Sequence, residues 1–281
     1  MGRGASLAGR TALLLRAPER AARTVEALAA RGARTVLCPL IDFELPADTT
    51  ELDAGVRRLV SGGYDWIVLT SITTIRALKQ RAGQLGLELT VPAATRLAAV
   101  GEASARAART EGLRVDFVPA DQSAVGLVAE LSLTGGERVF LPQADIAAET
   151  LAAGLNERGA SCDVVVAYRT VDSPAAPHRR LTAAVDVGQG TRPADAEVWE
   201  PARLAGDLDQ IDAVLFTSPS IARAFASVAG TGLAGIAVAI GESTRAELEN
   251  LGFARIVTSA EPTPASMADA WESALRHGPE H

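Results

Sequence analysis

The sequence predicts an α/β fold with two parallel-sheet domains, and three observations lead to this prediction. The chain has 281 residues, which at roughly 150 residues per domain suggests two domains of ordinary size. Short β-branched runs such as Ile67-Val68-Leu69 alternate with segments of helical spacing, a pattern typical of parallel sheets covered by helices on both faces. The third observation is that two different parts of the chain are each repeated.

The first repeated unit relates residues 9–33 to residues 136–160, 127 positions further along. Each copy starts with a short apolar strand, at residues 12–15 and 139–141. Apolar residues then follow at helical spacing, and an Arg-Gly-Ala sequence ends each copy. Because glycine commonly follows a helix end, each copy is predicted to form a strand, a helix and a second strand.

The second repeated unit relates residues 65–71 to residues 212–218, a shift of 147 positions. Further along, Val100-Gly101-Glu102-Ala103-Ser104 matches Ile240-Gly241-Glu242-Ser243-Thr244 at a shift of 140, which also carries Gly112 onto Gly252. Each copy contains two strands, each followed by the start of a helix. The repeat predicts that the two domains share one internal arrangement.

Residues 172–210 interrupt this pattern. Four prolines and three glycines are spread through this segment and break any long helix or strand; they are Pro174, Pro177, Gly188, Gly190, Pro193, Pro201 and Gly206. We expect an insertion or crossover that is partly mobile.

Composition excludes several classes of protein. The net charge is −7 and aromatic residues make up 4%, which argues against a nucleic-acid binder. The three histidines lie in Pro-rich or terminal segments, so a histidine triad or metal cluster is not expected. No apolar run reaches the ~20 residues of a membrane helix, and no signal-peptide core follows Met1. We expect a cytoplasmic monomer with no metal. The two cysteines, Cys38 and Cys162, could form a disulfide, but in a reducing compartment lone cysteines are more often small buried hydrophobic residues.

Hydroxyl and glycine residues recur where predicted strands give way to helices, at Ser71, at Ser104 behind Gly101, at Ser218, and at Thr244 behind Gly241. Such a serine alone is explained as a helix cap. Several such turns at one crevice would instead gather free N–H groups and helix dipoles, which bind anions. The repeated turns therefore favour a ligand that carries several carboxylates or phosphates.

Few side chains remain for proton transfer or ion pairing. Tyr168 ends an apolar strand and is one of two tyrosines; it is either a packed ring at a sheet edge or a catalytic phenol. Arg16, at the end of the first strand, either pairs with a ligand carboxylate or is solvated, and its repeat counterpart is Gln143. Motifs of dinucleotide, P-loop, serine-hydrolase and zinc-protease sites are missing.

These residues together resemble the uroporphyrinogen-III synthase family over nearly the whole chain, apart from the tail and 172–210. Each motif is short, but their order and spacing match that family. The resemblance is carried by Leu13-Leu14-Leu15-Arg16, Leu69-Thr70-Ser71, Val100-Gly101-Glu102-Ala103-Ser104 with residues 119–127, Val139-Phe140-Leu141-Pro142, Tyr168-Arg169-Thr170, Phe216-Thr217-Ser218-Pro219-Ser220 and Ile240-Gly241-Glu242-Ser243-Thr244.

The resemblance implies two α/β domains joined by a two-stranded linker, with the substrate in a cleft between them. Residues 1–40 plus 172–281 would form one domain and residues 43–168 the other. The family cyclises hydroxymethylbilane, a linear tetrapyrrole bearing acetates and propionates, to uroporphyrinogen III with loss of water and inversion of the last ring. It needs no cofactor, and catalysis is largely positioning.

By motif match, the resemblance assigns Tyr168 to assisting departure of the hydroxyl group. It assigns Ser71, Ser104, Ser218 and Thr244 to the substrate-lining hydroxyls, and Arg16, Gly101 and Gly241 accompany them in the expected binding site. Two alternatives stay open. One is a ligand-binding or regulatory protein that kept the fold without turnover. The other is a periplasmic-type binding protein with two lobes, against which the missing signal sequence argues.

Overall fold

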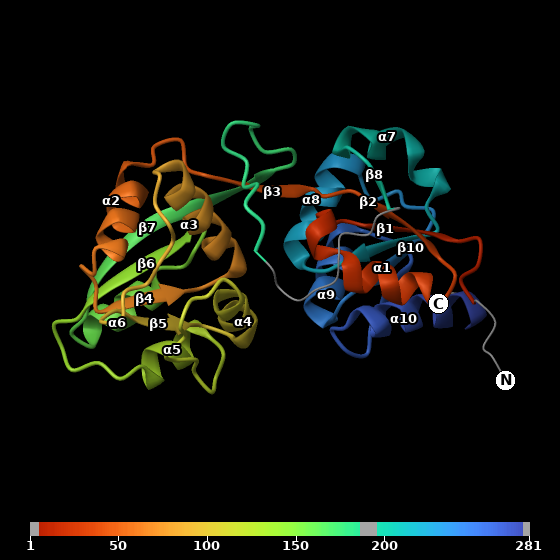
Figure 1. Ribbon diagram of the computed structural model, residues 1–281. Helices are drawn as coiled ribbons and strands as arrows, with labels where there is room; N and C mark the ends of the chain where they lie inside the picture. The colour runs from red at the N-terminus through yellow and green to blue at the C-terminus, as the bar shows by residue number, and fades with distance from the viewer. Residues whose placement is uncertain (1–5, 186–195, 278–281) are drawn as a thin grey trace. The chain divides into compact units, whose positions relative to one another are not determined.

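The computed structural model describes residues 6–185 and 196–277, and within them the chain forms two compact units (Figure 1). Unit 1 comprises residues 6–42, 172–174 and 196–277 of the described chain, and unit 2 comprises residues 43–171 and 175–185. The family resemblance implies that all of residues 172–281 belong to the first domain. In the structure, residues 175–185 instead group with unit 2.

Unit 2 is built on a five-stranded sheet with strand order β3-β7-β6-β4-β5. The four strands from β7 to β5 pair in parallel. The strands are β3 (Ile41–Glu44), β4 (Trp66–Leu69), β5 (Arg96–Ala99), β6 (Arg138–Ala144) and β7 (Ser161–Asp172). The helices are α2 (Thr50–Val60), α3 (Ile72–Gln84), α4 (Glu102–Thr110), α5 (Ala124–Glu130) and α6 (Thr150–Glu157).

Helices cover both faces of the unit 2 sheet, because successive strand residues point to opposite faces. On β4, Ile67 and Leu69 pack into a core shared with α2, α3 and α4. Trp66 and Val68 pack into a second core shared with α5 and α6. All four side chains are buried, so both faces of the sheet exclude water as the continuous apolar run predicts.

Unit 1 contains a six-stranded parallel sheet with strand order β11-β10-β9-β1-β2-β8. Its strands are β1 (Thr11–Leu14), β2 (Arg34–Leu37), β8 (Glu197–Val198), β9 (Ala213–Phe216), β10 (Ile236–Ala239) and β11 (Ile256–Thr258). Its helices are α1 (Ala22–Ala29), α7 (Leu204–Asp207), α8 (Pro219–Ala229), α9 (Glu242–Leu251) and α10 (Pro264–His277), with 3₁₀ turns at Pro18–Arg20, Pro201–Arg203 and Leu208–Gln210.

The unit 1 sheet also separates two cores. Phe216 of β9 contacts a core with α8 and α9, where its ring meets Phe225 edge-on at 5.3 Å. Leu215 packs on the other face with α1 and α10, against the fully buried Trp271. The predicted α/β class with parallel sheets covered by helices is confirmed in both units.

The sequence repeats correspond to the same strand order in the two units. Strands β10-β9-β1-β2 of unit 1 take the places that β5-β4-β6-β7 take in unit 2. The correspondence extends to a single bridge between Ala98 and Phe117, which occupies the place where Val238 pairs with Val257 in β11. The repeat is therefore structural as well as sequential.

The glycines that end the first repeated unit have the backbone conformation predicted for them. Gly32 has φ of 84° and Gly159 has φ of 88°, a left-handed region that residues with a Cβ rarely adopt. Each turns the chain from α1 or α6 into the next strand, β2 or β7.

The segment after β7 is packed against unit 2 and is not a free insertion. Arg76 of α3 donates to the carbonyls of Leu181 and Ala183, each at 3.0 Å. Glu44, which is almost fully buried, pairs with Arg179 at 2.9 Å. Further along, β8 joins the edge of the unit 1 sheet and Trp199 is buried beside it. The remainder of the expected mobile insertion, residues 186–195, lies outside the described residues.

Candidate functional site

The residues singled out from the sequence lie at the carboxyl ends of parallel strands in both units. In unit 2, Ser71 follows β4, Gly101 follows β5, and Tyr168 of β7 pairs with Ala144 at the end of β6. Because parallel strands all end at one edge of a sheet, these residues share that edge. Open α/β sheets bind ligands beyond this edge.

The structure brings Ser71 and Tyr168 together. The Ser71 Oγ lies 3.1 Å from the Tyr168 phenol oxygen, although the two residues are 97 positions apart in sequence. The Tyr168 ring packs edge-on against Phe43, with ring centroids 5.6 Å apart. Tyr168 keeps only 7% of its surface exposed. The Tyr168 side chain is therefore held in place by the contact of its ring with Phe43 and by the Ser71 hydroxyl next to its phenol oxygen.

Both predicted serine caps are present. Ser71 accepts a hydrogen bond from the Thr74 N–H at 3.1 Å and begins α3. Ser218 accepts one from the Ile221 N–H at 3.3 Å and begins α8. The capping interpretation of these serines thus holds. Ser71 also makes the contact with Tyr168, which capping does not require.

The two glycine-led helix starts differ between the units. In unit 2, the Gln122 side chain accepts the Glu102 N–H at 2.9 Å, so the start of α4 is already occupied. In unit 1, a Cβ added at Gly241 would meet no atom of the described residues within 4 Å. The start of α9 therefore has space for a ligand, whereas the Gln122 side chain occupies the corresponding place at the start of α4.

Ser104 and Thr244 offer less surface than the sequence suggested. They retain only 7% and 1% of their surface, because each is the third residue of its helix and faces the interior of its own unit. The assignment of their hydroxyls to a ligand stays a prediction. What these helix starts present is mainly backbone N–H.

Arg16 is partly buried just beyond the end of β1, the strand next to β9. Burial lowers the pKa of its guanidinium, and the nearby Arg20 lowers it further. Among the side chains that the structure describes, none is found in a hydrogen bond or ion pair with the Arg16 guanidinium. A partly desolvated cation with no carboxylate partner among the described side chains favours a bound anion. The repeat counterpart, Gln143, is buried in unit 2.

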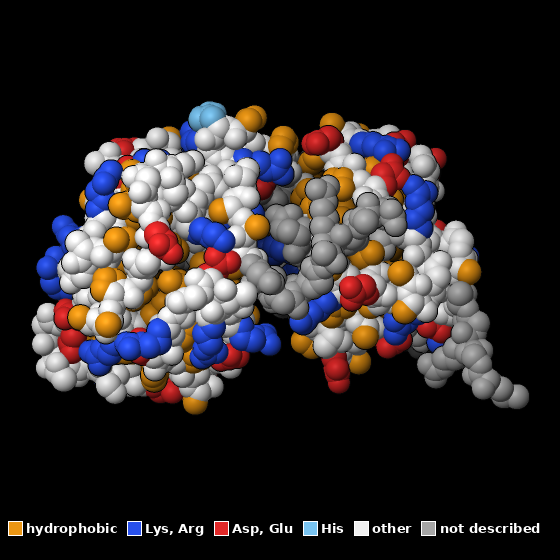
Figure 2. Space-filling view, in the orientation of Figure 1, with side chains coloured by type: hydrophobic (Ala, Val, Ile, Leu, Met, Phe, Trp, Pro, Cys, Tyr) orange, Lys and Arg blue, Asp and Glu red, His pale blue; other side chains and the backbone are white. Residues whose placement is uncertain are grey.

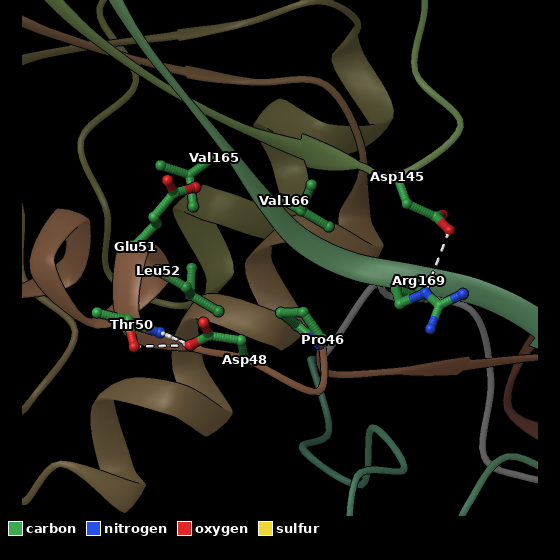
Figure 3. Close-up of a pocket in the computed structure, with 9 residues that line it drawn as sticks. All are labelled: Pro46, Asp48, Thr50, Glu51, Leu52, Asp145, Val165, Val166 and Arg169. Carbon is green, nitrogen blue, oxygen red and sulfur yellow. Dashed lines mark hydrogen bonds and ion pairs between the residues drawn. The ribbon is translucent and has the colours of Figure 1, made fainter.

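A separate hollow of about 630 Å³ lies on unit 2 (Figure 3). Arg169 and Asp145 face each other across 3.5 Å at its rim, and Asp48 accepts hydrogen bonds from Thr50 at its other end. Its lining residues are Pro46, Asp48, Thr50, Glu51, Leu52, Asp145, Val165, Val166 and Arg169. They include none of the predicted site residues, so the hollow is distinct from the Ser71 and Tyr168 contact.

No cluster of three or more His, Cys, Asp or Glu side chains suited to a metal ion is found in the described ranges. On the face shown in Figure 2, basic and acidic side chains are interspersed over each unit. None of the helices that the structure describes is long and apolar enough to span a membrane.

Sequence reasoning missed three residues at these strand ends, namely Phe43, Thr74 and Gln122. Thr74 follows Ser71 by three positions, the spacing of a capping partner, and this was an available signal. Gln122 lies within residues 119–127, a segment already singled out, but its contact with Glu102 spans 20 positions. Phe43 gave no signal, because its partner Tyr168 is remote in sequence.

Comparisons with known proteins agree with the family resemblance of the sequence. A family profile described as "Uroporphyrinogen-III synthase HemD" matches residues 22–269. A Methanothermobacter thermautotrophicus protein with the provisional name uroporphyrinogen-III synthase is 31% identical over 224 residues, 76% of each chain. Uroporphyrinogen-III synthase from Synechococcus elongatus is 28% identical over 58% of this chain and 62% of its own length.

Solved structures support the fold. A mutant uroporphyrinogen III synthase from the extremely thermophilic bacterium Thermus thermophilus superposes with a TM-score of 0.57 at 21% identity, covering 95% of this chain and 99% of that one. The enzyme from Helicobacter pylori gives 0.53 at 15% identity with the same coverage. At these identities the likeness concerns the fold alone.

Proposed function

The chain belongs to the uroporphyrinogen-III synthase family, and from this premise we propose that it closes hydroxymethylbilane to uroporphyrinogen III with loss of water and inversion of the terminal ring. The family consists of hydro-lyases of tetrapyrrole and heme biosynthesis. Membership favours this enzyme over the non-catalytic protein of the same fold that the sequence left open.

The observation that carries the proposal is the placement of the predicted residues at the carboxyl edges of two parallel sheets. The substrate carries an acetate and a propionate on each ring, so it needs several anion-binding groups. Helix starts supply N–H groups and a positive dipole end for this purpose. A chain with net charge −7 needs such local groups to bind a polycarboxylate.

Unit 1 supplies the strongest of these groups. Arg16 brings a cation without a described partner, and the open start of α9 behind Gly241 brings backbone N–H donors. Ser218 adds a hydroxyl at the start of α8, within 3.0 Å of the Ser220 hydroxyl. These groups follow β1, β10 and β9, which are neighbours in the sheet, so they can engage adjacent carboxylates of one ligand.

Tyr168 is the group that we assign to proton transfer. Its phenol donates to the hydroxyl of the substrate as the carbon–oxygen bond breaks, and the hydroxyl departs as water. The proton returns when the attacked ring carbon loses its hydrogen, so the reaction is balanced without an oxidant or reductant. A positioned general acid typically contributes ~10²–10⁴-fold to rate. The remaining task is holding a reactive chain in one conformation.

We propose that the protein acts as a cytoplasmic monomer. Cys38 and Cys162 are both free thiols, which suits a reducing compartment. Burial raises the pKa of the Cys38 thiol to about 12 and that of Cys162 to about 11. Both thiols thus stay protonated and unreactive at neutral pH. Light scattering after size-exclusion chromatography tests the monomer.

The decisive experiment supplies freshly generated hydroxymethylbilane and separates the uroporphyrin isomers after oxidation. Isomer III in excess over the uncatalysed control supports the proposal, and isomer I alone refutes it. The variant Tyr168→Phe should lose about 10²-fold or more in turnover if the phenol is the general acid. Unchanged turnover would remove Tyr168 from the mechanism.

A further inference from the structure

Three hydrogen-bonding groups surround the Ser71 hydroxyl at nearly equal distance. The Thr74 N–H, the Thr74 Oγ1 and the Tyr168 phenol oxygen each lie 3.1 Å from Ser71 Oγ. A serine hydroxyl has one proton to donate and two lone pairs that accept. The N–H can only donate, so it occupies one lone pair.

One lone pair and one proton of Ser71 then remain for two hydroxyl partners. In the first arrangement Thr74 donates to Ser71, and Ser71 donates to Tyr168. In the second, Tyr168 donates to Ser71, and Ser71 donates to Thr74. The two arrangements differ in where the phenol proton points, and only the first leaves it for a ligand.

Burial at Thr74 decides between the two. Thr74 is fully buried at 0% exposure, and among the described residues Ser71 is the partner that its hydroxyl contacts. The second arrangement would leave the Thr74 proton without an acceptor inside the core, and buried donors without partners are strongly disfavoured. Tyr168, with 7% exposure at the strand edge, is the better place for the unused proton.

We propose that Thr74 is a positioning residue that acts through Ser71 to keep the phenol proton of Tyr168 directed at the departing hydroxyl group. This inference rests on the function proposed above. Thr74 fills both acceptor positions of Ser71, Ser71 therefore donates to the phenol oxygen, and the proton of the phenol is free for the substrate. After transfer, the same Ser71 donor stabilises the phenolate until the proton returns.

The test replaces Thr74 with Val, which keeps the branched shape and removes the hydroxyl. With one acceptor position of Ser71 vacant, the phenol can donate inward and lose its direction. We expect kcat for isomer III to fall about 10-fold with KM within twofold, consistent with loss of one directing hydrogen bond. Thr74→Ser restores the hydroxyl and should recover kcat to within about threefold.

Thr73 provides a matched control, since it is also a largely buried threonine of α3. Thr73→Val should leave kcat, KM and the isomer ratio unchanged. In a Tyr168→Phe background, Thr74→Val should have no further effect, because its action passes through the phenol. An equal loss in both backgrounds, or no loss in wild type, overturns the proposal.

A readout without substrate separates this inference from the function itself. The chain has two tyrosines, so protein labelled with carbon-13 at the tyrosine Cζ gives two resonances, assigned with Tyr168→Phe. The Cζ shift differs between a phenol that accepts and one that donates a hydrogen bond. It should move in Thr74→Val and not in Thr73→Val. A resonance unchanged in Thr74→Val refutes the proposed direction, whichever isomer wild type makes; isomer I alone refutes the function.

Discussion

Gly241 offers the sharpest test of how the ligand is held. Its φ of 178° is extended backbone that any residue adopts, and an added Cβ would meet nothing within 4 Å in the part of the chain that the structure describes. The Gly241→Ala variant should therefore fold normally. If a substrate carboxylate sits on the N–H groups that start α9, the new methyl group will occupy part of that position.

The expected magnitudes separate folding from binding. Alanine is a poorer helix cap than glycine by roughly 0.5–1 kcal/mol, while the reduced freedom of the unfolded chain returns about 0.4–1 kcal/mol. The net change in unfolding free energy is near zero, so Tm should move by less than about 4 °C. Loss of a hydrogen bond to a charged group costs ~1.5–3 kcal/mol, which raises KM about 10- to 150-fold.

Gly101→Ala is the matched control in unit 2. There the Gln122 Oε1 lies 3.3 Å from the added Cβ, and it already accepts a hydrogen bond from the Glu102 N–H. The end of a flexible side chain can give way, and no free donor is lost. We expect KM to rise less than about threefold, corresponding to well under 1 kcal/mol.

The assay measures initial rates of isomer III formation against hydroxymethylbilane concentration for wild type and both variants. A fluorescence titration with uroporphyrin III, which does not react, gives the affinity directly. A KM for Gly241→Ala equal to that of wild type, with its Tm preserved, would refute binding at the start of α9. Equal increases in both variants would refute the difference between the two units.

Three further predictions concern the core, a buried carboxylate and Arg16. Gly55→Ala in α2 should destabilise the fold by roughly 1–2 kcal/mol, because its Cβ would lie 2.5 Å from the Phe140 ring. A Cβ at Gly83 in α3 would meet none of the described atoms within 4 Å, so Gly83→Ala should raise the free energy of unfolding by up to ~1 kcal/mol; urea unfolding measures both changes. Hydrogen bonds, chiefly from the Thr134 backbone and hydroxyl, lower the pKa of Glu137 to about 2 from 4.5. The stability that the Glu137 carboxylate confers is therefore complete above about pH 4.5 and is lost as the pH falls toward 2. The difference in Tm between wild type and Glu137→Gln should decrease over the same pH range, and a difference that does not change with pH would contradict this prediction. Arg16→Gln gives Arg16 the residue type of its repeat counterpart, Gln143. This variant should raise KM about 10-fold and make KM less dependent on salt concentration. A salt dependence of KM like that of wild type would argue against an ion pair between Arg16 and the ligand.

The α/β class with parallel sheets and the equivalence of the two units could be predicted, because apolar runs and repeats are read directly from the residues and do not depend on knowing distant contacts. The repeat from 65–71 to 212–218 aligned β4 with β9, and the Arg-Gly-Ala endings placed Gly32 and Gly159 correctly. Serine capping at Ser71 and Ser218 also followed from residue type and position.

The remaining features depend on contacts between residues far apart in the chain. The 175–185 segment is held by polar side chains of α3, such as Arg76 and Gln80. Nothing in the sequence around these two residues indicates that their partners lie about 100 positions away. The same holds for the contact of Tyr168 with Ser71. Burial of Ser104 and Thr244 depends on the direction of the helix over its sheet, which motif matching does not provide.

The sheet of unit 1 draws its strands from both ends of the gene product. β1 lies between β2, which follows it closely, and β9, whose register joins Leu13 to Val214. During synthesis, all strands of unit 2 leave the ribosome before β9 does, so unit 2 can complete its sheet while β1 still has an open edge. Exposed strand edges invite wrong pairing. A nascent chain that has emerged from the ribosome through residue 185, but not yet through residue 213, would therefore contain a complete unit 2 and a unit 1 that is vulnerable to aggregation.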